Sequence, residues 1–115
     1  MEAPHTRAIS WFRARKDFEK FPEKVQEICL TALTIATEGG KSDIAAPWHG
    51  LGSGVFEIKL RFKGNAFRVV YAVHLDDDIW VIDAFQKKST HGIATPKHEI
   101  DLVKDRLRDL KEMLK

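Results

Sequence analysis

Basic side chains gather in two windows of this 115-residue chain, although its net charge is only +2. Residues 57–68 contain four basic residues and one acidic residue, and residues 86–98 contain three basic residues and no acidic one. If the two windows meet in space, they form the local cationic surface that phosphate groups require. The residues concerned are Lys59, Arg61, Lys63 and Arg68 with Glu57 in the first window, and Lys87, Lys88 and Lys97 in the second.

The first window lies in a predicted β-hairpin. Residues 55–62 alternate strictly between large apolar and charged side chains, which is typical of a half-buried strand. Residues 67–74 and 79–85 predict two further antiparallel strands. A four-residue turn at 63–66 would place Arg61 opposite Arg68, Lys59 opposite Val70 and Glu57 opposite Ala72, with no carboxylate facing either arginine. If His74 likewise faces Ile79, Arg68 lies beside Phe85, and Lys87 follows on the same face.

This register allows two interpretations. In one, the arginines extend separately into water and bind nothing. In the other, Lys59, Arg61, Arg68 and Lys87 converge on a phosphate, and the ring of Phe85 offers a surface on which a base can stack. Cationic contact combined with stacking is a common way of holding single-stranded RNA.

The remaining elements must position these side chains. We expect a strand in residues 7–12, a short helix in 14–21, and a longer helix that begins at Pro22 and ends at Gly39. Residues 41–54 are expected to form a loop. A C-terminal helix follows, with Thr95 as its N-cap and Pro96 in its first turn. The order β-α-α-β-β-β-α predicts a single α+β domain over residues 1–115, in which a small antiparallel sheet packs against helices.

Other reactive residue types carry weaker signals. Cys29 lies on the apolar stripe of the long helix, so we expect it to be buried, and Tyr71 is expected to be a packing residue. The five histidines show no metal-binding spacing, and no metal or cofactor is expected. His98 is either a surface residue or a residue that transfers protons close to the basic segment. No apolar run is long enough to cross a bilayer and the N-terminus does not resemble a signal peptide, so a cytoplasmic protein is expected.

Several segments resemble the RelE/HigB superfamily of toxins. The runs EIKLR (57–61) and FRVVY (67–71) are similar to its strand signature, and AFQKKS (84–89) with GIATPKHEI (92–100) resembles its phage-derived, HigB-like branch. The resemblance implies a RelE-like fold and a metal-independent endonuclease that cuts mRNA on the ribosome. In that reaction the RNA 2′-hydroxyl attacks the adjacent phosphate. It also implies an antitoxin partner with a helix-turn-helix domain.

The resemblance also implies roles for individual residues. Arg68 matches a phosphate-binding arginine, Arg61 its neighbour on the next strand, and Lys59 a catalytic lysine. Lys87, or else Lys88, matches the residue that assists the leaving group, and Phe85, Lys88 and His98 would contact RNA.

The sequence departs from the family pattern at Glu57, which stands where relatives have a second lysine, and at Asp83, where a histidine would be expected. The general base could therefore be Glu57, Lys59 or His98. The C-terminal tyrosine of some relatives has no counterpart. Two alternatives to the nuclease remain: a ParE-like inhibitor of DNA gyrase, and a non-catalytic module of prophage origin that binds RNA or protein.

Overall fold

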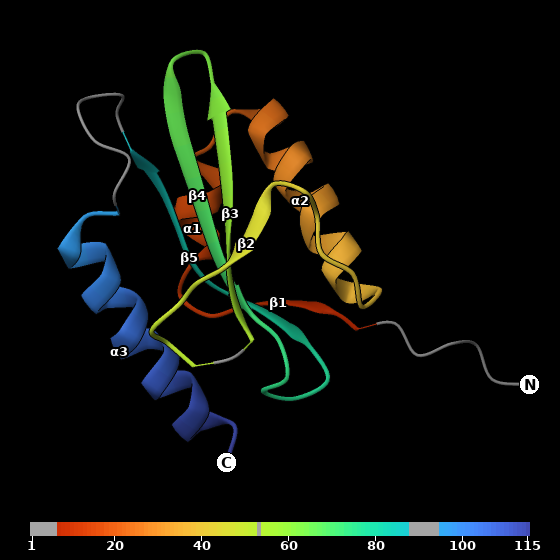
Figure 1. The fold of residues 1–115 in the computed structure, drawn as a ribbon, viewed down its shortest axis with the longest axis vertical. Helices are drawn as coiled ribbons and strands as arrows, with labels where there is room; N and C mark the ends of the chain where they lie inside the picture. Colours follow the sequence, from red (N-terminus) through yellow and green to blue (C-terminus); the bar gives the residue numbers. More distant parts are fainter. Residues whose placement is uncertain (1–6, 53, 88–94) are drawn as a thin grey trace, which may run out of the picture.

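A five-stranded sheet forms the centre of the computed structural model, which describes residues 7–52, 54–87 and 95–115. The strand order is β1-β5-β4-β3-β2 (Figure 1). The strands are β1 (Ile9–Trp11), β2 (Ala45–Pro47), β3 (Val55–Phe62), β4 (Asn65–Ala72) and β5 (Ile79–Lys87).

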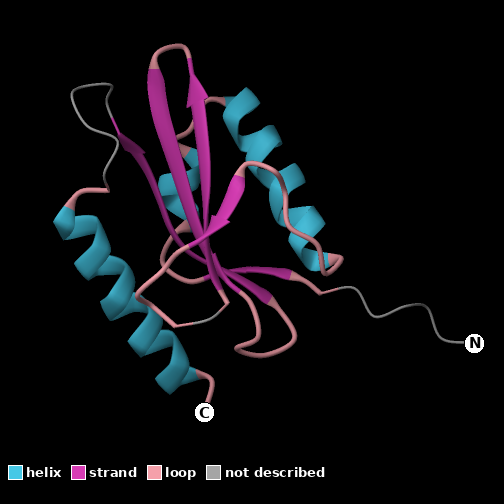
Figure 2. Cartoon of the chain, in the orientation of Figure 1, coloured by secondary structure: helices cyan, strands magenta, loops and turns pink. Residues whose placement is uncertain are grey.

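Helices cover both faces of the sheet (Figure 2). On one face, α1 (Arg15–Glu19) and α2 (Glu23–Thr37) enclose a core that contains Cys29, Phe67 and Tyr71. On the other face, α3 (Lys97–Met113) covers a smaller core through Val103, Leu107 and Leu110. Burial raises the pKa of both the Cys29 thiol and the Tyr71 phenol to about 12, so both groups stay neutral. The expectation that these two residues are packing residues is confirmed.

The predicted α+β class is confirmed, but the sheet is mixed, because β1 runs parallel to β5. A further difference is β2, which lies inside the segment expected to be a loop and pairs with β3 between Phe56 and Ile58. Its sequence, Ala45-Ala46-Pro47, has neither β-branched side chains nor a clear alternation. Pairing with β3, rather than local propensity, therefore makes it a strand.

The hairpin between β3 and β4 has a tighter turn than expected. Phe62 pairs with Asn65, which leaves only Lys63 and Gly64 in the turn. Both have positive φ, 49° and 81°, as in the type I′ turns that suit two-residue hairpins. The expected four-residue turn is therefore wrong, and Lys59, rather than Arg61, lies opposite Arg68. Because the observed pairing differs from the predicted one by two residues, every side chain of β3 and β4 keeps its predicted face.

A β-bulge interrupts the pairing of β4 with β5. Arg68 lies beside Phe85, as predicted, but Val70 pairs with Asp83 whereas Tyr71 pairs with Val81. The additional residue on β5 shifts the register beyond it, so the predicted pairing of His74 with Ile79 is wrong. Ile82 joins the core beneath α3, and its neighbour Asp83 contacts Arg106 of the same helix. The bulge thus directs two consecutive side chains toward α3.

The start of α3 also differs from the expectation. The helix begins at Lys97 without a side-chain capping hydrogen bond, so Thr95 is not its N-cap. The Thr95 hydroxyl instead donates to Glu57 Oε2 at 3.2 Å, which ties the segment before α3 to β3. None of the helices in the described ranges combines the length and apolar character needed to span a bilayer.

Candidate functional site

Six of the predicted site residues lie in cross-strand rows on the face of the sheet that α3 partly covers: Glu57, Lys59, Arg61, Arg68, Phe85 and Lys87. Because paired residues direct their side chains to the same face, the register defines these rows. Arg61 and Arg68 lie on adjacent antiparallel strands and share this face, as predicted. From the hairpin tip inward the rows are Arg61–Ala66–Lys87, Lys59–Arg68–Phe85 and Glu57–Val70–Asp83.

Glu57 contacts both cations of the second row. Its Oε1 lies 3.8 Å from Nζ of Lys59, and its Oε2 lies 3.6 Å from Nε of Arg68. The expectation that no carboxylate faces the arginines is therefore wrong for Arg68. The cause is the two-residue turn, which brings Glu57 one row closer to Arg68 than the four-residue turn would.

The cations of the site differ in their access to solvent. The Arg68 side chain is only 11% exposed, and its Nη1 donates to the carbonyl of Phe67 at 3.4 Å. Lys59 is 56% exposed and Arg61 is also exposed. An incoming phosphate would thus meet Lys59 and Arg61 first, whereas Arg68 is held in place by Glu57 and by the backbone.

The remaining predicted site residues that the structure describes lie within these rows or on α3. Phe85 is half-buried beside Arg68, and Lys87 shares the outer row with Arg61. His98 is strongly exposed in the first turn of α3, with Nε2 3.8 Å from Glu99 Oε1. Lys88 lies outside the described residues.

A buried carboxyl pair next to the cationic rows was not predicted. Asp83 is 1% exposed, and its pKa is raised to about 8 by burial and by the hydrogen bond and negative charge of Glu99; Arg106, 3.4 Å away, opposes this rise. Asp83 Oδ2 and Glu99 Oε2 are buried, and neither has a hydrogen-bond partner among the residues that the structure describes. A proton shared between the two groups would satisfy both oxygens.

The carboxyl pair lines a cavity of about 280 Å³ between β5, α1 and α3, and Phe85 lines the same cavity. The departure of Asp83 from the expected histidine was the only sequence signal at this position. Within the described ranges, no group of three or more His, Cys, Asp or Glu side chains could hold a metal ion.

Comparison with protein-family models relates residues 16–108 to the family described as "Phage derived protein Gp49-like (DUF891)". The chain belongs to this family. The match extends from α1 into the last turns of α3 and includes every predicted site residue of the Gp49-like chain. The Gp49-like family is related to toxin–antitoxin systems. Comparisons with curated proteins and with solved structures gave no significant match.

Proposed function

We propose that this Gp49-like protein is the toxin of a type II toxin–antitoxin pair, and that it cleaves mRNA on the ribosome without a metal ion. The proposal rests on one arrangement: Lys59 and Arg68 lie opposite each other, with Glu57 within 4 Å of both and Phe85 on the far side of Arg68. This arrangement combines cations for a phosphate, a candidate base and an aromatic ring.

Positioning of the phosphate would be the first task of the site. Lys59 and Arg61 are exposed cations within one row of each other and can receive a backbone phosphate. Arg68 lies behind them with its guanidinium fixed by Glu57. A guanidinium held in advance stabilises the additional negative charge of the transition state without reorganising during the reaction.

Cleavage requires a base near the 2′-hydroxyl. The 2′-oxygen forms a bond to phosphorus while the bond to the 5′-oxygen breaks, which leaves a 2′,3′-cyclic phosphate. A base takes the 2′-hydroxyl proton, and an acid supplies a proton to the departing 5′-oxygen. Glu57 is the candidate base best supported by position, because it contacts Lys59 and Arg68 simultaneously. Lys87, on the outer row, is the candidate acid, with Lys88 as the alternative.

A toxin of this kind requires a partner that neutralises it. The proposed partner is a helix-turn-helix antitoxin encoded next to this chain, and both proteins would act in the cytoplasm. Acidic or amphipathic segments suit such a partner because the exposed face of this chain carries Lys59 and Arg61.

The near-burial of Arg68 favours a second candidate, a non-catalytic binding module. An arginine that is 11% exposed and paired with Glu57 can also serve only to hold β3 and β4 together. A gyrase inhibitor on the same fold would likewise need no nuclease site.

Controlled expression in cells distinguishes the three functions. After induction, 5′ ends on a translated reporter mRNA and the supercoiling of a plasmid are measured in the same culture. The nuclease predicts new cuts within translated codons before any change in supercoiling. Supercoiling that changes first would favour the gyrase inhibitor, and a change in neither readout would favour the binding module.

A further inference from the structure

Strand β1 leaves one edge of the sheet open, because it is the last strand in the order and no described strand pairs with its outer side. On the inner side, the Ala8 carbonyl accepts a hydrogen bond from Ile79 N, and Phe12 N donates to the Val81 carbonyl, both at 2.8 Å. Successive residues of a strand direct their backbone groups to alternate sides. Ile9 and Trp11 therefore direct their N–H and C=O groups toward the open edge.

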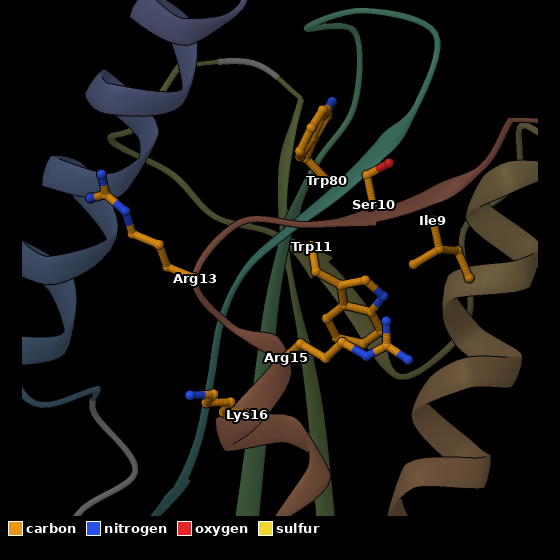
Figure 3. Close-up of a pocket in the computed structure, with 7 residues that line it drawn as sticks. All are labelled: Ile9, Ser10, Trp11, Arg13, Arg15, Lys16 and Trp80. Carbon is orange, nitrogen blue, oxygen red and sulfur yellow. The ribbon is translucent and has the colours of Figure 1, made fainter.

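Two cavities flank this open edge. The larger, about 660 Å³, lies on the side of Ser10 and Trp80 and also includes Arg13 and Lys16 (Figure 3). The smaller, about 290 Å³, lies toward α2 and includes Phe18 and Leu30. Ile9, Trp11 and Arg15 line both cavities. An extended chain lying along β1 would thus find a cavity for side chains on each of its two faces.

The charges around the larger cavity are ordered along the strand. Beyond the C-terminal end of β1 lie Arg13, Arg15 and Lys16. Arg13 pairs with Asp109 at 2.9 Å and Arg15 with Glu19 at 3.7 Å. Lys16 has no ion pair with any described residue.

At the other end of the cavity the neighbouring side chains are acidic. Ser10 Oγ donates to Asp78, and Trp80 Nε1 donates to Asp76, each at 2.8 Å. The cavity is therefore basic at one end only, and a ligand with acidic groups is directed toward Lys16.

We propose that β1 accepts an extended segment of the neutralising partner as an additional strand, an inference that rests on the toxin–antitoxin function proposed above. The segment would place apolar side chains in the cavity next to Leu30 and acidic side chains beside Arg15 and Lys16. A peptide fits this edge better than RNA does, because only a peptide repeats N–H and C=O groups at the spacing of the groups on Ile9 and Trp11. Main-chain hydrogen bonds would supply affinity, and the two cavities would supply specificity.

Hydrogen exchange of the complex tests this proposal. The chain is co-expressed with the product of the small neighbouring gene, and amide exchange is compared between the free protein and the purified complex. The outward amides of Ile9 and Trp11 are expected to exchange quickly in the free protein and to become protected in the complex.

A charge-reversal variant gives an independent readout. Arg15→Glu combined with Lys16→Glu should weaken the complex about tenfold or more at low salt and by a smaller factor at high salt. Lys24→Glu on α2, a 65%-exposed lysine paired with Glu27, is the matched control and should change affinity little. Melting curves of the uncomplexed variants verify that each one folds.

Each outcome is decisive. Protection of β1 together with weakening by the double reversal supports the added strand. A tight complex with unprotected β1 amides overturns the added strand and leaves the toxin–antitoxin proposal standing. The absence of any complex would overturn both proposals.

Discussion

Glu57 Oε2 lies 3.6 Å from Nε of Arg68, and each of these two side chains is only 11% exposed. Thr95 donates to the same oxygen of Glu57, so three segments of the chain meet at this carboxylate. Glu57 can serve only to neutralise the charge of the nearly buried Arg68. Alternatively, Glu57 can act as a base next to the arginine that stabilises the phosphate. These roles differ in their effects on stability and on rate.

Replacing Glu57 with glutamine separates the two roles. Glu57→Gln keeps the shape but removes the negative charge, so Arg68 loses its partner and stability should fall by about 1–3 kcal/mol. If Glu57 is the base, the cleavage rate should also fall by about 10²-fold or more. Urea unfolding measures the stability and a ribosome cleavage assay measures the rate.

The control for this experiment is Glu112→Gln, an exposed glutamate that is paired with Lys115 near the end of α3, and it should change neither quantity. A Glu57→Gln protein that loses stability but cuts at the wild-type rate would limit Glu57 to a structural role.

The carboxyl pair predicts a pH dependence of stability. The pKa of Asp83 is raised from 3.8 to about 8 in the folded protein, so the folded state keeps a proton that the unfolded state releases above pH 4. This group therefore destabilises the folded state progressively between about pH 4 and pH 8, by at most about 1.4 kcal/mol per pH unit for one proton, and adds no further slope above that range.

Asp83→Asn removes this proton linkage. We expect the difference in unfolding free energy, variant minus wild type, to rise between pH 5 and pH 8 in urea titrations. Loss of the contact between Asp83 and Arg106 shifts that difference by an amount that does not depend on pH over this range. A difference that stays constant with pH would show that Asp83 is ionised in the folded protein.

The β3–β4 turn predicts a loss of stability that comes from backbone strain and not from a steric clash. Gly64 has φ 81°, and a Cβ added to it would meet nothing within 4 Å. Gly64→Ala should therefore cost about 1–2 kcal/mol through backbone strain alone. Lys63→Asn is a second test of the same turn. Lys63 has φ 49°, a conformation that asparagine tolerates well, so this substitution should stabilise the hairpin. Urea unfolding that shows no loss for Gly64→Ala would contradict the assigned turn.

The sequence predicts which face of the sheet each side chain of β3 occupies, but it does not predict which residues of β3 and β4 pair. Alternation along residues 55–62 assigns every side chain of β3 to the correct side, since burial of the phenylalanines excludes a one-residue shift. A two-residue shift keeps that alternation intact, so only the geometry of the turn decides it. For this reason the contact between Glu57 and Arg68 could not be predicted.

Pairing partners distant in sequence were likewise beyond prediction. Nothing in Ile9–Trp11 indicates that it runs parallel to β5, and nothing in Ala45–Pro47 indicates a strand. The bulge at Ile82 has no local sequence signal, yet it places Asp83 beneath α3. The carboxyl pair depends on all of this long-range packing, so the contact of Asp83 with Glu99 could not be predicted from local sequence.

Cleavage by 2′-hydroxyl attack at the group around Arg68 leaves 2′,3′-cyclic phosphate ends, so the chemistry of the new 3′ ends is the sharpest test of the proposed function. Purified wild type, Arg68→Ala and Lys111→Ala are incubated with ribosomes that carry a defined mRNA, and 2′,3′-cyclic phosphate ends are counted over time after each variant is shown to be folded. We predict cyclic phosphates at similar rates from wild type and Lys111→Ala, and a rate about 10²-fold lower from Arg68→Ala. Equal rates from wild type and Arg68→Ala, or no cyclic phosphate from wild type, would contradict cleavage by this group of residues.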